Sequence, residues 1–199
     1  PIEPDAVAWT AARLLALQAP DPARVVLIDM DPHPSSDAAN KIALGDAGIG
    51  VVLMQPERLP LLPRALDAAA KHGATLAVLD TPPGHGPALS AAAAAADFVL
   101  IVSRPSAADL IRVPETLALI RAAGRRCALL FNFYPSDQRR REIGEAAALA
   151  VSFGVEIATA TLGARVAFER IAAGEPLPPG PAADEASRLY RYMQNMIYS

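Results

Sequence analysis

Short, uninterrupted apolar segments that end in an acidic residue recur along this chain and most constrain its fold. Residues 25–28 read Val-Val-Leu-Ile and end at Asp29, and residues 76–79 read Leu-Ala-Val-Leu and end at Asp80. A strand that is apolar at every position is buried on both faces, which is typical of a parallel sheet covered by helices. The carboxyl ends of such strands meet at one edge, where ligands bind in α/β proteins. We therefore expect Asp29 and Asp80 to lie at a shared ligand-binding edge.

Segments long enough for helices separate these apolar runs along the whole chain. Further strands are predicted at residues 51–54, 98–102, 127–131 and 155–160. Helices are predicted at residues 4–17, 35–44, 61–72, 107–122, 137–153, 164–173 and 182–197, with an alanine-rich helix between Gly86 and Phe98. This alternation predicts an α/β protein with a doubly wound, mostly parallel sheet and helices on both faces. Because the loops are short and no linker or repeat is present, residues 1–199 are expected to form a single domain.

The composition excludes several classes of protein. With 52% hydrophobic and 20% charged residues, the chain is neither disordered nor unusually charged. Its formal net charge of −3 argues against a generally basic surface for nucleic acid, although a local basic patch is compatible with it. Cys127 is the single cysteine, so a disulfide framework is excluded and a reducing, cytoplasmic setting is expected. No apolar run is long enough for a transmembrane segment, and we expect no signal peptide.

Four segments, taken together and in order, resemble the motifs of one protein family. They are Leu-Ile-Asp-Met-Asp-Pro at 27–32, Leu-Asp-Thr-Pro-Pro at 79–83, the stretch 96–106, and the arginine-containing segment 162–168 with Gly-Glu-Pro at 174–176. On these motifs the chain resembles the ParA/MinD family of deviant Walker P-loop ATPases, in particular its short plasmid-partition-like branch. The resemblance covers most of the chain and implies a P-loop NTPase-like fold.

The resemblance implies roles for the residues at the strand ends. Asp29 would be catalytic, positioning the attacking water or acting near the magnesium sphere, and Asp80 would hold magnesium largely through water. Asp31, Thr81 and Pro82 would belong to the nucleotide-binding and nucleotide-sensing segments. The implied cofactors are ATP and Mg²⁺, an ion that prefers oxygen ligands and retains waters. The alternative is structural. Asp29 and Asp80 would cap the turns and helices after their strands, and Asp31 would stabilise a turn.

The phosphate-binding loop of the family is not visible in the sequence. The family has a strand and then K-G-G-x-G-K-[ST] directly before the helix that is predicted here at 4–17, but residues 1–5 contain neither lysine nor glycine. Glu3 and Asp5 at that helix N-terminus would occupy the place of an anion and repel a triphosphate. One like-charge contact at ~4 Å and an effective dielectric of about 20 costs roughly 4 kcal/mol.

The family's first strand, which is central in its sheet, is likewise missing from residues 1–199. If the central position of the sheet stayed empty, the two strands beside it would each have a row of unpaired backbone groups. The chain starts at Pro1 rather than at methionine, so we expect residues upstream of it. Either those residues supply the strand and the P-loop, or the neighbouring strands close up.

Arginines at two places are candidates for contact with DNA or a partner. Arg139, Arg140 and Arg141 lie near the start of the helix predicted at 137–153, where cations oppose the helix dipole. For Arg165, the resemblance favours an interface or DNA contact. An ordinary solvated surface is the alternative at both places.

The function that the resemblance implies is that of a cytoplasmic, ParA-like partition or positioning protein. Such a protein couples ATP binding and hydrolysis to dimerisation and to the positioning of DNA or cargo, with a homodimer, a ParB-like or other adaptor and nonspecific DNA as partners. A nucleotide-independent pseudo-ATPase that acts as a protein-interaction module is the alternative, favoured by the acidic residues at the P-loop position and by His33 in place of glutamine. A metabolic P-loop relative, such as an amidotransferase-type synthetase, would need a substrate-binding insertion that this sequence does not show.

Overall fold

The computed structural model describes residues 5–31, 44–84, 86–133, 140–172 and 175–199. Its strands are β1 (Val25–Asp29), β2 (Gly50–Leu53), β3 (Leu76–Asp80), β4 (Phe98–Ser103), β5 (Arg126–Phe131) and β6 (Glu156–Ile157). Its α-helices are α1 (Asp5–Leu17), α3 (Leu62–Lys71), α4 (Pro87–Ala95), α5 (Ala107–Leu110), α6 (Val113–Ala122), α7 (Arg140–Ser152), α8 (Val166–Ala172) and α9 (Pro181–Tyr198). Two 3₁₀ helices, η1 (Pro22–Arg24) and η2 (Pro56–Leu61), complete the described elements.

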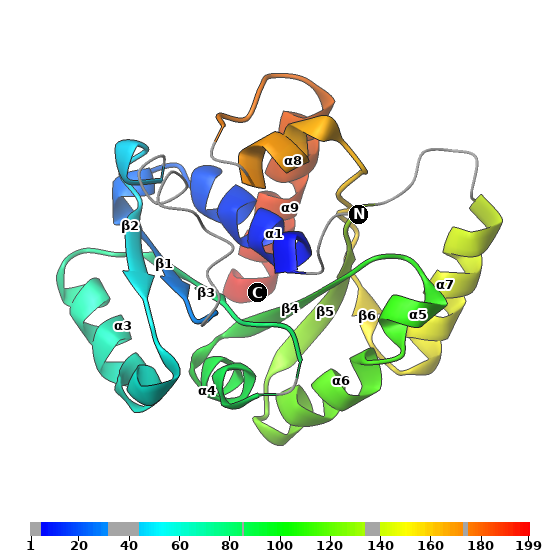
Figure 1. The fold of residues 1–199 in the computed structure, drawn as a ribbon, viewed down its shortest axis with the longest axis horizontal. Coiled ribbons are helices and arrows are strands. Elements are labelled where there is room, and N and C mark those ends of the chain that lie inside the picture. Colours follow the sequence, from blue (N-terminus) through cyan, green and yellow to red (C-terminus); the bar gives the residue numbers. More distant parts are fainter. Residues whose placement is uncertain (1–4, 32–43, 85, 134–139, 173–174) are drawn as a thin grey trace.

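The strands form two three-stranded sheets in which every pair is parallel (Figure 1). The order is β2-β1-β3 in one sheet and β4-β5-β6 in the other. Within the described part of the chain, β3 and β4 are therefore edge strands and do not pair with each other. The sequence left two outcomes open for the missing central strand, and direct pairing of its neighbours is wrong for the residues that the structure describes.

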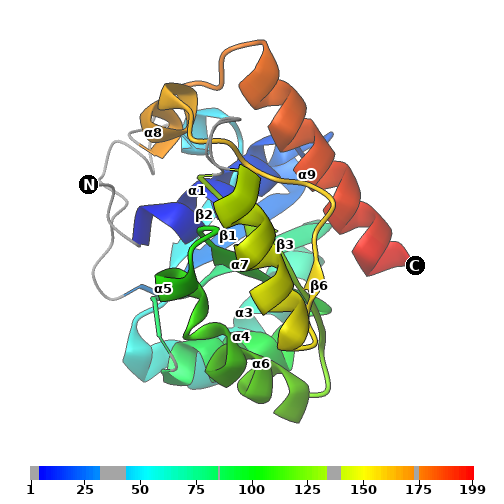
Figure 2. The same cartoon turned by 90° about the vertical axis from the view of Figure 1, so that its right-hand side faces the viewer.

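Helices cover both faces of the two sheets, which confirms the predicted doubly wound α/β class (Figures 1 and 2). On one face, α1 packs against Leu27 of β1, and α1, α8 and α9 pack against Leu130 of β5. On the other face, α3 and α4 pack against Ile28, and α6 and α7 pack against Leu129. Neighbouring residues of one strand thus enter cores on opposite faces, which explains why these strands are apolar throughout.

Two alanine-rich helices span both sheets. In α1, Ala12 packs in the core beside β1, whereas Leu14 packs in the core beside β4 and β5. In α4, Ala92 packs with the β1 sheet and Ala93 packs with the β5 sheet. These helices lie on opposite faces, so together they join the sheets across the line where β3 and β4 do not pair.

The helix predicted at 107–122 is divided into α5 and α6. Pro114 lies in the first turn of α6. Proline has no backbone N–H and its ring clashes inside a helix, but it is tolerated in a first turn. A new helix therefore starts at Val113, and the proline marks the break that apolar spacing alone did not show.

The other predicted elements differ mainly at their ends. The last strand, predicted at 155–160, is reduced to Glu156–Ile157 as a strand, although Ala158 still donates a backbone hydrogen bond to Leu129. The helix predicted at 35–44 falls on residues 32–43, which lie outside the described residues.

Candidate functional site

Asp29 and Asp80 lie side by side at the carboxyl edge of the first sheet. They are direct partners in the parallel register of β1 and β3. Asp29 is 3% exposed and Asp80 is 9% exposed. The Met30 N–H donates to the Asp80 carbonyl over 2.9 Å, and the Met54 N–H donates to the Asp29 carbonyl over 2.8 Å. Backbone pairing therefore continues past the strand ends and fixes both acids in place.

The Asp29 side chain also stabilises the turn that follows β1. Its Oδ1 atom accepts a hydrogen bond from the Asp31 N–H over 3.0 Å. A carboxylate that bonds the backbone two residues later is typical turn chemistry. The structural role that the sequence left open for Asp29 is thus present, and the role in catalysis stays a prediction.

A cavity of about 1250 Å³ separates β3 from β4. Both strands line it along their whole length, and α1, α4 and α9 contribute to its walls. Its lining near the carboxyl edge includes Asp31, Asp80, Thr81, Pro82 and Arg104. The structure thus brings Asp80 together with the three residues predicted to bind nucleotide, and Asp29 lies beside them in register with Asp80.

Polar residues at the carboxyl ends of β4 and β5 were not predicted as site residues. Ser103 is 7% exposed and Asn132 is fully buried, and the Asn132 N–H donates to the Ser103 carbonyl over 2.9 Å. The Arg104 guanidinium lies 5.7 Å from the ring centre of Phe133, within cation–π range. A polar residue directly after an apolar run was the signal that identified Asp29, and the same signal would have found Ser103 and Asn132.

The residues at this edge fit magnesium better than they fit a triphosphate. Carboxylate oxygens at Asp29 and Asp80 and the Thr81 hydroxyl are the oxygen ligands that Mg²⁺ prefers, and one or two carboxylates suffice when waters and phosphates complete the shell. Among the described residues, no group of three or more His, Cys, Asp or Glu is placed to hold a metal. The described lining of the cavity contains no lysine. A phosphate-binding loop is thus not among the described residues, and we derive no step of ATP hydrolysis from them.

The arginine run lies apart from this edge. Arg139 is outside the described residues, and Arg140 begins α7, with its side chain likewise not described. Arg141 is exposed and its Nε donates to Glu145 over 2.9 Å, an i,i+4 pair on one helix face. This contact agrees with the solvated-face alternative and leaves contact with DNA or a partner as a prediction.

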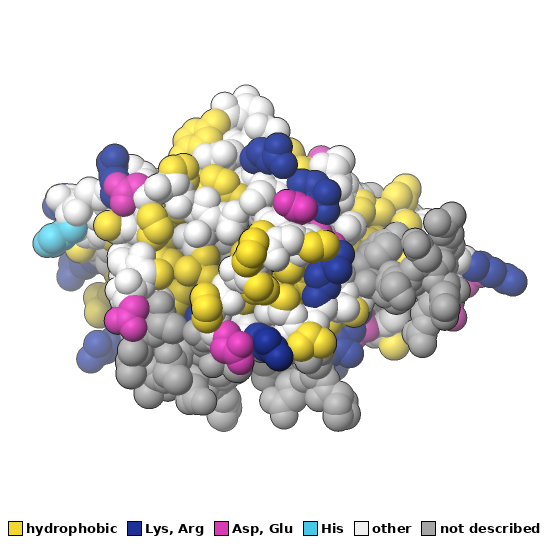
Figure 3. Space-filling model, turned by 90° about the horizontal axis from the view of Figure 1, so that it is seen from above, with side chains coloured by type: hydrophobic (Ala, Val, Ile, Leu, Met, Phe, Trp, Pro, Cys, Tyr) yellow, Lys and Arg dark blue, Asp and Glu magenta, His cyan; other side chains and the backbone are white. Residues whose placement is uncertain are grey.

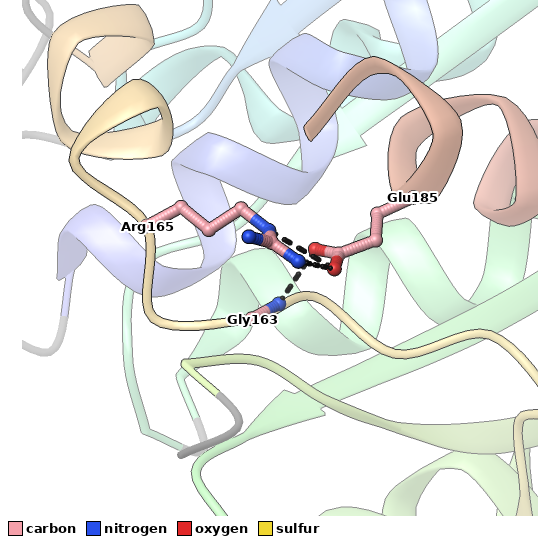
Figure 4. Close-up of polar contacts among 3 residues, drawn as sticks. All are labelled: Gly163, Arg165 and Glu185. Carbon is pink, nitrogen blue, oxygen red and sulfur yellow. Dashed lines mark hydrogen bonds and ion pairs between the residues drawn. The ribbon is translucent and has the colours of Figure 1, made fainter. Parts of the chain in front are cut away.

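Arg165 is held by an ion pair with Glu185, in which the arginine side chain is 39% exposed and the glutamate side chain 10% exposed (Figure 4). Its guanidinium donates from two nitrogens to Oε1 of Glu185, with the Nε contact at 3.0 Å, and the Gly163 N–H donates to Oε2 over 2.9 Å. The hydrogen bond to Glu185 raises the pKa of the Arg165 guanidinium, while burial acts in the opposite direction. Because Glu185 is 8% exposed, this contact ties the segment before α8 to α9. The predicted role of Arg165 in contact with DNA or a partner is not tested by this contact.

Charges are intermixed on the face of the molecule seen in Figure 3. Basic and acidic side chains lie next to one another and next to apolar ones, without a continuous basic patch among the residues coloured there. Across the described helices, none combines the length and the apolar character that crossing a membrane requires.

Several solved structures share this architecture. No protein-family model and no curated protein matches the chain. The cell-division ATPase MinD of Pyrococcus furiosus matches with a TM-score of 0.69 at 17% identity, covering 96% of this chain and 94% of that chain. A putative plasmid partition protein of Borrelia burgdorferi, bound to AMPPNP, matches with a TM-score of 0.71 at 14% identity, covering 97% and 95%. A MinC:MinD cell-division complex of Aquifex aeolicus matches with a TM-score of 0.70 at 15% identity, covering 94% and 90%. At such low identity these likenesses show the fold, which is that of the ParA/MinD ATPases, as the motifs predicted.

Proposed function

We propose that this protein is a ParA-like positioning protein that couples ATP binding and hydrolysis to dimerisation and to the placement of DNA or protein cargo. The observation that carries the proposal is the register of Asp29 with Asp80 at the carboxyl edge of a ParA/MinD-like fold. Two carboxylates fixed side by side at this edge are suited to a magnesium–phosphate ligand.

The proposal gives each edge residue a role. Asp80 would hold Mg²⁺ largely through water, and Asp29 would orient the water that attacks the terminal phosphate. Asp31, Thr81 and Pro82 would contact the nucleotide or respond to it, as residues that line the same end of the cavity. Bound Mg²⁺ would neutralise phosphate charge, which phosphoryl transfer requires.

The proposed partners follow from the same fold. They are a second copy of the chain, a ParB-like or other adaptor and nonspecific DNA, with Arg139, Arg140, Arg141 and Arg165 as candidate contacts. The solved MinC:MinD complex supports an adaptor, because it shows that this fold binds a protein partner. We place this activity in the cytoplasm.

A nucleotide-independent interaction module is the second candidate. The observation that favours it is Asp5 as the first residue of α1, at a helix end that would otherwise attract anions. Without a phosphate loop among the described residues, Asp29 would serve the turn that its side chain already stabilises. Nucleotide binding by the intact protein separates the two candidates.

The decisive experiment is a titration of the protein, carrying its natural N-terminus, with a fluorescent ATP analogue in Mg²⁺ and in EDTA. Saturable binding that requires Mg²⁺ supports the ATPase proposal. Asp80→Asn should then weaken binding in Mg²⁺ by about tenfold or more, since one lost charge–metal contact costs about 1.4 kcal/mol or more. Light scattering with and without nucleotide would show whether dimers depend on it.

Asp97→Asn is the matched control. Asp97 lines the same cavity just before β4, at the amino end of that strand, away from the proposed metal. It should leave Mg²⁺-dependent binding unchanged. No binding by the intact protein would contradict the ATPase proposal and favour the interaction module, and equal losses in both variants would remove Asp80 from the metal site.

A further inference from the structure

We infer that Arg104 binds a phosphate group of the ligand at the carboxyl edge of the sheets, and that the ring of Phe133 positions its guanidinium. This inference rests on the proposed function, because it names a residue for the same site. The ligand chemistry that it concerns is the phosphate group, whether a nucleotide or an inorganic polyphosphate carries it.

Arg104 is the described arginine that lies at the carboxyl edge of the cavity. Among the described residues, three arginines line the cavity, Arg24, Arg104 and Arg112. Arg24 directly precedes β1 and donates to the Gly73 carbonyl over 3.0 Å, and Arg112 lies between α5 and α6. Arg104 directly follows β4 and is half-buried. It therefore provides positive charge at the end of the cavity where Asp80 lies.

An anionic ligand at this edge needs that positive charge. Asp31 and Asp80 line the same end of the cavity, and their carboxylates would repel a phosphate group. Mg²⁺ would offset the charge of the carboxylate that holds it, whereas a guanidinium can bind the phosphate oxygens directly. Its planar arrangement of N–H donors matches two phosphate oxygens at once. Because the described lining contains no lysine, Arg104 is the group suited to this contact.

The backbone around Arg104 is fixed by contacts at the ends of β4 and β5. The Asn132 N–H donates to the Ser103 carbonyl over 2.9 Å, so the pairing of the two strands continues to this point. The Ser103 hydroxyl donates to the Arg104 carbonyl over 3.0 Å. The Arg104 guanidinium lies 5.7 Å from the ring centre of Phe133, within cation–π range. Both the backbone and the charged group of Arg104 are therefore positioned.

Phe133 has an unusual backbone conformation. Its φ is +53°, and among the described residues no other residue except glycine has a positive φ. The Asn132 Oδ1 atom accepts a hydrogen bond from the Phe133 N–H over 2.7 Å, which stabilises this conformation. Bulky residues rarely adopt the left-handed region, and residues held there cluster at ligand clamps. Because the Phe133 ring lies against the Arg104 guanidinium, a function in positioning that group accounts for the strain.

Calorimetric titration of the intact protein in Mg²⁺ tests the role of Arg104. The two probes are ATP and inorganic triphosphate, which has no base and no sugar. We expect Arg104→Gln to weaken the binding of both probes by at least about tenfold, because a charge-assisted hydrogen bond is lost. Arg112→Gln removes the same charge from the lining of the same cavity and should bind both probes as the parent does. Equal binding by Arg104→Gln and the parent, or equal losses in the two variants, would overturn the inference.

Variants of Phe133 test its positioning role. Phe133→Leu removes the aromatic face and should weaken the binding of inorganic triphosphate by about threefold, and the conservative Phe133→Tyr, which keeps that face, should rescue it. Because the ring acts through the guanidinium, Phe133→Leu should have no further effect in an Arg104→Gln background. Losses that add in the double variant would show that Phe133 does not act through Arg104 and would overturn its positioning role.

A further measurement covers the case in which Arg104→Gln does not fold. Phenylglyoxal modifies arginine side chains, and mass spectrometry locates the modified residues in the parent protein. Inorganic triphosphate with Mg²⁺ should slow the modification of Arg104 and leave that of Arg112 unchanged. Modification of Arg104 at the same rate with and without the probe would overturn the inference.

The two probes separate this inference from the proposed function. Binding of inorganic triphosphate that depends on Arg104, without binding of ATP, would support the inference and contradict the proposed function. Binding of ATP that is unchanged in Arg104→Gln would overturn the inference alone. Binding of neither probe by the intact protein would overturn both.

Discussion

Glu185 joins the segment before α8 to α9 through a single carboxylate. Replacing it by glutamine removes the charge that holds Arg165 and weakens the bond from the Gly163 N–H. We expect Glu185→Gln to lower the free energy of unfolding by about 1–2 kcal/mol, because hydrogen bonds to a charged group contribute about 1.5–3 kcal/mol and neutral ones about 0.5–1.5 kcal/mol. Urea denaturation followed by circular dichroism measures this loss.

Arg141→Gln is the control for that change. It also breaks an arginine–glutamate pair, but the side chains of Arg141 and Glu145 are 93% and 64% exposed. Exposed pairs contribute about 0.2–1 kcal/mol at most, so this variant should unfold close to the parent. Equal effects of the two substitutions would show that the Glu185 contact is not structural.

Tyr192 makes the protein sensitive to strongly basic solution. Burial, followed by the charge of Glu156 and a hydrogen bond to its carboxylate, raises the pKa of Tyr192 to about 12. In the unfolded chain a tyrosine has a pKa of about 10. The folded state therefore holds this proton more tightly, and the resulting stability is complete below about pH 10 and is lost as the pH rises towards 12.

In Tyr192→Phe, the free energy of unfolding should no longer fall with pH between about pH 10 and pH 12 because of this residue. The measurement is the free energy of unfolding at several basic pH values, together with tyrosinate absorbance, in which one late titration should disappear. Tyr198→Phe is the control, because Tyr198 is 75% exposed. A pH dependence that survives in Tyr192→Phe would contradict the assignment.

At the scale of residues, sequence patterns located the acids at the strand ends but not the contacts of Glu185. Asp29 and Asp80 follow uninterrupted apolar runs, and such runs fix which edge of a parallel sheet their ends reach. Glu185 lies on α9, 20 residues after Arg165, which precedes α8, so no local spacing relates the two. Arg165 was accordingly considered as a surface residue, and the partner that holds it was missed.

Among the elements, α1 packs in two hydrophobic cores, one beside each sheet. Leu14 is fully buried in the core beside β4 and β5, while Ala12 on the same helix packs beside β1. We expect Leu14→Ala to lower the free energy of unfolding by about 2–5 kcal/mol, as is typical when a buried leucine is truncated. Val151→Ala on α7 is the control, because Val151 is 61% exposed and surface changes stay within about 0.5 kcal/mol.

The elements themselves were largely predictable. Apolar runs identified the strands at 25–29, 76–80 and 98–103 because burial on both faces leaves no polar position in them. The boundary between α5 and α6 was not predicted, since helical spacing continues across Pro114 and only backbone chemistry separates them. Strand length at β6 was overestimated because an apolar run remains buried after its ladder pairing ends.

For the molecule as a whole, the two sheets are joined by helices and not by strand pairing. Residues 1–199 should therefore unfold in two stages in urea, because the sheets open separately when no ladder of hydrogen bonds connects them. Alkylation of Cys127 in β5 reports one sheet, and Val51→Cys in a Cys127→Ser background reports the other. Different midpoints for the two cysteines are expected in residues 1–199. A single transition in residues 1–199 would contradict this account.

For the molecule as a whole, the sequence left open whether β3 and β4 would pair directly or stay apart, and physical reasoning could not choose between these outcomes. Pairing β3 directly with β4 would have satisfied their backbone groups, but α1 and α4 would then have faced a narrower sheet. The packing of those helices across both sheets depends on long-range contacts, which no local pattern encodes.

The alanine-rich helices on either side of the cavity have a consequence for how this protein should be assayed. The helices α1 and α4 pack across both sheets and hold them together, although β3 and β4 do not pair with each other. The separation of the two sheets sets how far Asp80 lies from Ser103, since both line the cavity, and thus the width of a ligand that could contact both. An assay of ligand binding at this edge therefore depends on α1 and α4 holding the two sheets at a fixed separation.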